Sequence, residues 1–103
     1  MGTAVFACKA SDVAPGSVIR VDFDQGALAI FNIEGSFYAT DDRCTHGLSS
    51  LSKGALDGDV IECSLHYGGF HVPTGEAVLP PCSINLKTYV VEMREDDVFV
   101  VLD

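Results

Sequence analysis

Two short cysteine and histidine motifs constrain the fold of this chain most strongly. Cys44-Thr45-His46-Gly47 and Cys63-Ser64-Leu65-His66 each combine one thiol and one imidazole at a spacing typical of metal ligands. The 16 residues between His46 and Cys63 are enough for a hairpin that brings the second pair back to face the first. The sequence therefore predicts two loops that hold one inorganic centre between them.

The rest of the sequence is typical of an all-β fold. Short apolar runs rich in Val, Ile, Phe and Tyr alternate with turn pairs such as Glu34-Gly35 and Asp57-Gly58. We expect one helical turn, at Ser11 to Ala14, with Ser11 as its N-cap candidate. The expected strands cover Ser17 to Phe23, Ala27 to Ile33, Ser36 to Thr40, Asp59 to Cys63, Gly69 to Val72, Leu86 to Met93 and Val98 to Leu102.

The length of 103 residues indicates a single domain. The sequence composition changes between residues 41 and 81, where the expected strands are short and Gly, Ser and Pro accumulate. We therefore expect one domain over residues 1–103. Its β base is formed by residues 1–40 and 82–103, and a loop-rich binding subdomain is inserted at about residues 41–81.

The formal net charge of −9 argues against nucleic acid as a partner. An acidic surface favours solubility, or it steers the chain towards a basic patch on a protein partner, and both interpretations stay open. Cysteines so close to histidines favour a reducing compartment. No apolar stretch is long enough for a signal peptide or a membrane span, so we expect a cytoplasmic protein without a membrane partner.

Two kinds of metal centre fit these ligands. Soft thiolates with imidazoles suit either tetrahedral zinc or an iron-sulfur cluster. A structural zinc site commonly pairs Cys with Cys and His with His, whereas each loop here contributes one of each. A two-iron cluster needs two ligands for each iron, which the mixed loops fit better. A structural zinc module for protein interaction is the alternative.

The pattern Cys-x-His, 16 residues, Cys-x-x-His resembles the Rieske 2Fe-2S motif, and the resemblance covers the whole chain. Together with Pro73-Thr74-Gly75 and Pro80-Pro81, it is most similar to the small ferredoxin components of bacterial aromatic-ring-hydroxylating dioxygenase systems. The resemblance implies a Rieske-type antiparallel β-sandwich base and one 2Fe-2S cluster.

The same resemblance implies the ligand set. Cys44 and Cys63 would bind the buried iron, and His46 and His66 the outer iron. A cluster with two thiolates is less negative than one with four, so adding an electron costs less Coulomb energy.

The function implied by the resemblance is one-electron transfer. A flavin-containing ferredoxin reductase would supply the electron, and a terminal oxygenase with its own Rieske centre and a mononuclear iron would receive it. We expect a monomer that is not itself an enzyme, because no motif for catalysis on an organic substrate occurs in the sequence. A small Rieske subunit of an oxidoreductase such as a nitrite reductase is the alternative.

Three residues beside the ligands predict a low reduction potential. High-potential relatives carry a disulfide between the two loops and a serine hydroxyl directed at a bridging sulfide. Ser49 and Leu65 occupy the positions of the two disulfide cysteines, and Gly68 occupies that of the serine. We therefore predict a midpoint near the low end of the Rieske range, about −150 mV.

The other notable residues have simpler interpretations. We expect His71 to be a half-exposed strand residue, and Cys8 and Cys82 to be small packing residues without a disulfide. Tyr67 either donates a hydrogen bond near the cluster or packs over its loop. Pro80-Pro81 is expected to stiffen a third loop that covers the cluster.

Overall fold

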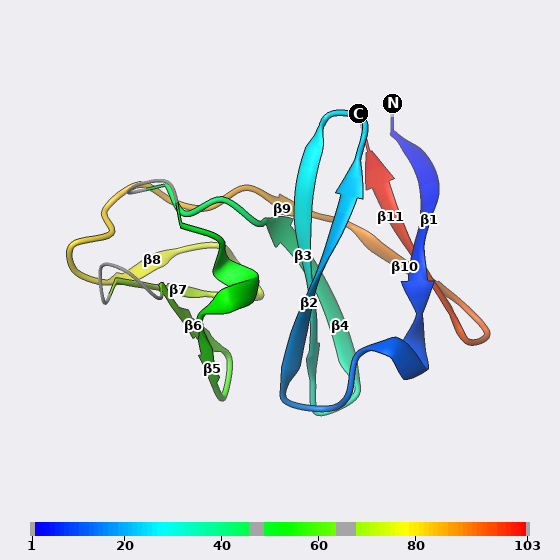
Figure 1. Ribbon diagram of the computed structural model, residues 1–103, viewed down its shortest axis with the longest axis horizontal. Helices are drawn as coiled ribbons and strands as arrows, with labels where there is room; N and C mark the ends of the chain where they lie inside the picture. The colour runs from blue at the N-terminus through cyan, green and yellow to red at the C-terminus, as the bar shows by residue number, and fades with distance from the viewer. Residues whose placement is uncertain (1, 46–48, 64–67, 103) are drawn as a thin grey trace.

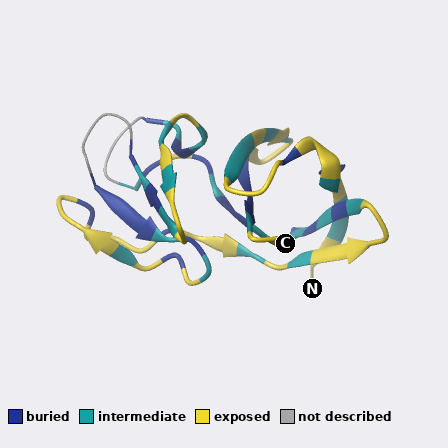
Figure 2. Cartoon of the chain, turned by 90° about the horizontal axis from the view of Figure 1, so that it is seen from below, coloured by how far each residue is buried: buried dark blue, intermediate teal, exposed yellow. Residues whose placement is uncertain are grey.

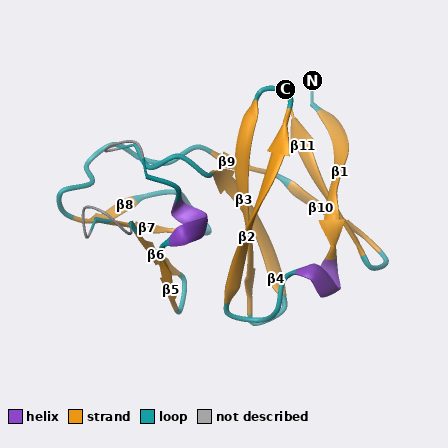
Figure 3. Ribbon diagram, viewed as in Figure 1, coloured by secondary structure: helices purple, strands orange, loops and turns teal. Residues whose placement is uncertain are grey.

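The computed structural model describes residues 2–45, 49–63 and 68–102, and within them it is built of antiparallel strands with two short 3-10 turns (Figures 1 and 3). The all-β prediction is therefore confirmed. The strands are β1 (Thr3–Lys9), β2 (Ser17–Phe23), β3 (Gly26–Ile33), β4 (Ser36–Asp41), β5 (Ala55–Asp57), β6 (Val60–Glu62), β7 (Gly69–His71), β8 (Ala77–Leu79), β9 (Thr88–Tyr89), β10 (Val91–Arg94) and β11 (Asp97–Leu102). The 3-10 turns are η1 (Ala10–Asp12) and η2 (Leu51–Lys53).

The strands form three sheets, with the orders β1-β11-β10, β2-β3-β4-β9 and β5-β6-β7-β8. The first two sheets enclose one apolar core and form the base, on the right of Figure 1. The third sheet lies at the other end of a molecule that measures 37 × 28 × 19 Å. All four of its strands lie within residues 55–79, inside the segment expected to bind the cluster.

Strand β3 is buried on both faces and contributes to the apolar cores at both ends of the molecule. Leu28 and Ile30 belong to the core between the base sheets, whereas Ala29 and Phe31 belong to a second core shared with the third sheet. Successive side chains of a strand point to opposite faces, so a continuous apolar run serves two cores at once. Figure 2 shows buried segments within both ends of the molecule.

The hairpin turns follow the expected chemistry. Glu34 and Gly35 both have positive φ, 53° and 90°, between the paired residues Ile33 and Ser36. Such two-residue turns match the right-handed twist of the flanking strands. Glu95 has a φ of 58° in the equivalent turn between β10 and β11.

The sequence patterns missed or misplaced several elements, most of them short, although β1 has seven residues. Strands β1, β5 and β8 were not predicted, and the run from Leu86 to Met93 divides into β9 and β10 on different sheets. The helical turn covers Ala10–Asp12 rather than Ser11 to Ala14. Three-residue strands exist only through pairing with a neighbour, which local sequence patterns do not report.

No helix among the described residues is both long and apolar enough to cross a membrane. The expected boundaries between base and binding subdomain, near residues 40 and 82, stay a prediction.

Candidate metal centre

The first ligand loop begins where β4 ends and is closed by backbone hydrogen bonds. The Cys44 N–H donates to the Ser49 carbonyl over 3.0 Å, and the Leu51 N–H donates to the Asp42 carbonyl over 2.6 Å. Arg43 and Ser50 form an isolated antiparallel bridge between these two contacts. The closed loop leaves Cys44 only 1% exposed.

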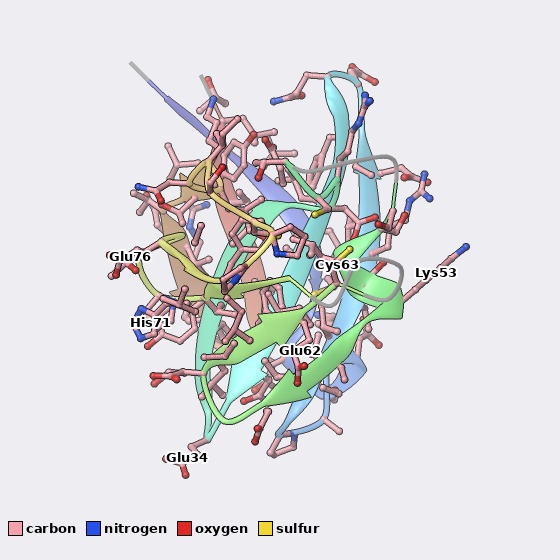
Figure 4. All side chains as sticks on the ribbon, turned by 90° about the vertical axis from the view of Figure 1, so that its left-hand side faces the viewer. Glu34, Lys53, Glu62, Cys63, His71 and Glu76 are labelled. Carbon is pink, nitrogen blue, oxygen red and sulfur yellow. The ribbon has the colours of Figure 1, made fainter. Side chains whose placement is uncertain are left out.

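The second ligand loop joins β6 to β7. Ile61 pairs with Phe70, and the Cys63 N–H donates to the Gly68 carbonyl over 2.7 Å, so the hairpin continues to the base of the loop. Cys63 is 3% exposed. Figure 4 shows it in the middle of this end of the molecule, whereas Lys53 points away at the edge.

A third segment, residues 80–84, contacts the first ligand loop. The Cys82 sulfur lies 3.9 Å from that of Cys44, and the Thr45 hydroxyl donates to the Ile84 carbonyl over 2.7 Å. The Pro80-Pro81 peptide bond within this segment is cis. The sequence suggested a covering loop here but not the thiol contact, because Cys44 and Cys82 are 38 positions apart.

Gly68 is required by this arrangement. A Cβ atom at position 68 would lie 2.2 Å from the Cys82 sulfur, closer than nonbonded atoms approach. Cys82 therefore occupies the space that a side chain at position 68 would need. This contact gives a steric reason why glycine, rather than the serine of high-potential relatives, occupies position 68.

Burial raises the pKa of the Cys82 thiol to about 11, and the neighbouring Cys44 and Cys63 contribute in the same direction. Burial also raises the pKa of Cys8, with a further contribution from the nearby Asp12 carboxylate. Both thiols are therefore protonated at neutral pH.

The described part of the candidate ligand set fits the thiolate half of a Rieske cluster. Cys44 and Cys63 form no disulfide, are buried in the same apolar core and are presented by two separate loops. His46 and His66, like Leu65 and Tyr67, lie outside the described residues. Within residues 2–45, 49–63 and 68–102, no three His, Cys, Asp or Glu side chains gather in a way that could hold a metal ion.

The remaining predicted residues have clear positions. His71 is half-buried on β7, and its ring nitrogens lie 3.0 Å from an Asp59 oxygen and 2.9 Å from the Thr74 hydroxyl. Cys8 and Cys82 are free and buried in different cores, so the prediction that they form no disulfide is confirmed. The side chain of His71 therefore contacts residues on two neighbouring segments, Asp59 and Thr74.

Known proteins share both sequence and fold with this chain. Residues 3–90 match the Rieske [2Fe-2S] domain. The biphenyl dioxygenase ferredoxin subunit of Pseudomonas sp. strain KKS102 is 50% identical over 91% of this chain and 87% of its own length. Ferredoxin CarAc of Metapseudomonas resinovorans is 49% identical over 90% of this chain and 88% of its own length.

A solved structure gives the same result in three dimensions. It is a complex of reduced oxygenase and oxidised ferredoxin in carbazole 1,9a-dioxygenase. The matching chain has a TM-score of 0.91 and 45% identity, over 95% of this chain and 92% of its own length. These similarities show the family, which contains one Rieske 2Fe-2S cluster. The chain belongs to the Rieske [2Fe-2S] family and is a ferredoxin similar to the ferredoxin components of bacterial aromatic-ring dioxygenases.

Proposed function

We propose that this ferredoxin carries single electrons from a flavin-containing ferredoxin reductase to the terminal oxygenase of a multicomponent aromatic-ring dioxygenase. Identity of 50% to a biphenyl dioxygenase ferredoxin subunit, and of 45% to the matching chain of the carbazole 1,9a-dioxygenase complex, is the observation that carries the proposal. The oxygenase partner would contain its own Rieske centre and a mononuclear iron. The biphenyl dioxygenase ferredoxin subunit and the carbazole 1,9a-dioxygenase complex belong to dioxygenase systems rather than to a nitrite reductase, which favours the carrier over that alternative.

The proposed ligands are Cys44 and Cys63 for the inner iron and His46 and His66 for the outer iron. When bound, the cluster supplies a centre that accepts and releases one electron. The two loops hold both thiols in an apolar core, which excludes water from the sulfur ligands. The low solvent exposure of the thiolates and the hydrogen bonds made to them both influence the reduction potential of such a cluster.

Replacement of the histidines tests the ligand assignment. His46→Cys or His66→Cys adds one thiolate charge, so the midpoint potential should fall by about 100 mV or more if the cluster still assembles. Protein-film voltammetry measures this shift. An unchanged potential would argue against that histidine as a ligand.

The formal charge of −9 suits brief encounters with basic surfaces on both partners. Electron-transfer rates should therefore fall as ionic strength rises. We also propose a cytoplasmic monomer in which residues 41–81 form the cluster-binding part of one domain, residues 1–103.

The purified protein allows a direct test. A Rieske electron paramagnetic resonance (EPR) signal after reduction, and stopped-flow transfer of the electron to a dioxygenase terminal oxygenase, are the expected results. The midpoint potential should lie near about −150 mV, and a value above about +100 mV would contradict the low-potential assignment. A colourless protein that contains zinc, or stable co-elution with an oxidoreductase on gel filtration, would contradict the carrier.

A further inference from the structure

Ser49 lies in the first ligand loop and also contacts the second. It is 5% exposed and lies at the closing end of the first loop. Its carbonyl accepts the Cys44 N–H over 3.0 Å, and its hydroxyl oxygen lies 2.9 Å from the Cys63 sulfur. One side chain and its own backbone thus contact both candidate thiolate ligands.

The direction of the hydroxyl contact follows from the chemistry of a ligand sulfur. A cysteine bound to iron has lost its proton and can only accept a hydrogen bond. A serine hydroxyl has one proton to donate. With iron bound, the Ser49 hydroxyl is therefore the donor and the Cys63 thiolate the acceptor.

We propose that Ser49 is a positioning residue that links the two ligand loops without a covalent bond and raises the reduction potential through its hydrogen bond to the Cys63 thiolate. This inference rests on the proposed function, specifically on Cys63 as a cluster ligand. It also changes the interpretation of position 49. The sequence indicates only that a disulfide cysteine is absent there, whereas the fold places a hydroxyl donor on a ligand sulfur.

The sign of the effect follows from charge. Reduction adds one negative charge, and part of it is shared by the sulfur ligands. A donor to a thiolate therefore forms a stronger hydrogen bond in the reduced state than in the oxidised state. Because Ser49 and Cys63 are both buried, water screens this difference weakly. Ser49 thus stabilises the reduced form.

Cys82 provides an internal contrast. Its thiol lies 3.9 Å from the Cys44 sulfur, and S–H is a weak donor. The hydroxyl of Ser49 is both closer to its ligand sulfur and a better donor. The influence of Ser49 on the potential should therefore exceed that of Cys82.

The test compares midpoint potentials of the cluster-loaded protein by protein-film voltammetry. Ser49→Ala should weaken the preference for the reduced state by about tenfold, a fall of about 59 mV for a one-electron couple. Ser49→Thr keeps the hydroxyl and should stay near the parent value, and Ser49→Cys, with a weaker donor, should lie between. The matched control is Ser50→Ala, because the neighbouring Ser50 side chain does not cap η2, and its potential should equal the parent value.

A second readout follows the link between the loops. Ser49→Ala should release iron to a chelator faster than the parent, with Ser50→Ala again unchanged. Faster release with an unchanged or raised potential would overturn the inference, because a purely structural serine produces that result. If Ser49→Ala assembles no cluster, the inference depends on Ser49→Cys, and a potential for that variant equal to the parent value overturns it.

Failure of the inference differs from failure of the proposed function. A parent protein without a Rieske EPR signal would refute the cluster itself. A parent with that signal whose potential does not respond to position 49 would refute only the role of Ser49.

Discussion

The described residues form two apolar cores that differ in the cysteines they contain. The core between the base sheets contains Cys8, and the core beside the third sheet contains Cys44, Cys63 and Cys82. All four side chains are buried and free of disulfides. Burial therefore does not distinguish a ligand from a packing residue. The second core differs because separate loops bring several thiols together there.

The largest expected effect is on iron content, which should respond to a cysteine replacement in the second core but not to one in the base core. Cys63→Ala should abolish the cluster, because the proposed inner iron would lose one of its two thiolates. Cys8→Ala should keep full iron and cost only about 1 kcal/mol of stability through the lost packing. Iron analysis, EPR and urea unfolding measure these outcomes. A full Rieske EPR signal in Cys63→Ala, or a Cys8→Ala protein without iron, would contradict this difference between the two cores.

The two faces of β3 allow a finer comparison. Ile30→Val shortens a side chain in the base core, and Phe31→Leu shortens one in the core that holds the candidate ligands. Each should lower the free energy of unfolding by about 1 kcal/mol. Only Phe31→Leu should speed the release of iron to a chelator under native conditions. Equal release rates for the two variants would show that the cores do not act separately.

Steric exclusion at Gly68 predicts an interaction between two positions. Gly68→Ala places a methyl group against the Cys82 sulfur and should cost about 1–3 kcal/mol through overpacking. Cys82→Ala removes that sulfur but leaves the Cβ and N atoms of residue 82, each 3.1 Å from the added carbon, so the double variant should recover part of the loss. Thermal unfolding of the single and double variants gives the coupling. A double variant that is no more stable than Gly68→Ala would contradict the assigned contact.

The smallest expected effect is a pH dependence of the base core. The pKa of the Cys8 thiol is raised by burial and by Asp12, so the folded state holds that proton more tightly than the unfolded chain does. Its stabilising contribution is complete below the pKa of the unfolded thiol, about 8.5, and is lost as the pH rises through the folded pKa.

Thermal midpoints of the parent and of Cys8→Ala between about pH 7 and pH 10 check this expectation. The parent should lose stability slightly more steeply above about pH 8.5. Parallel curves would mean that Cys8 does not titrate differently in the folded state.

The sequence reported the local parts of the fold accurately. The strands with strong apolar runs and the turn at Glu34-Gly35 are predicted because apolar runs and turn residues act over a few positions. The turn expected at Asp57-Gly58 lies one residue later, at Gly58 and Asp59, because Asp57 pairs with Val60. Strands β5 and β8 are three residues long and depend on their neighbours in the third sheet. Their own residues carry too little signal to predict them.

For the site, the sequence by itself determined the candidate ligand types, their spacing and the family, because those are properties of short motifs. Only the tertiary structure decided that the Ser49 hydroxyl meets Cys63 and that Cys82 fills the space beside Gly68. Each of these contacts joins residues that are 14 positions apart in the sequence and lie on separate loops. The contacts depend on how backbone hydrogen bonds close each loop. Motif spacing reports which atoms are available, whereas packing decides which of them meet.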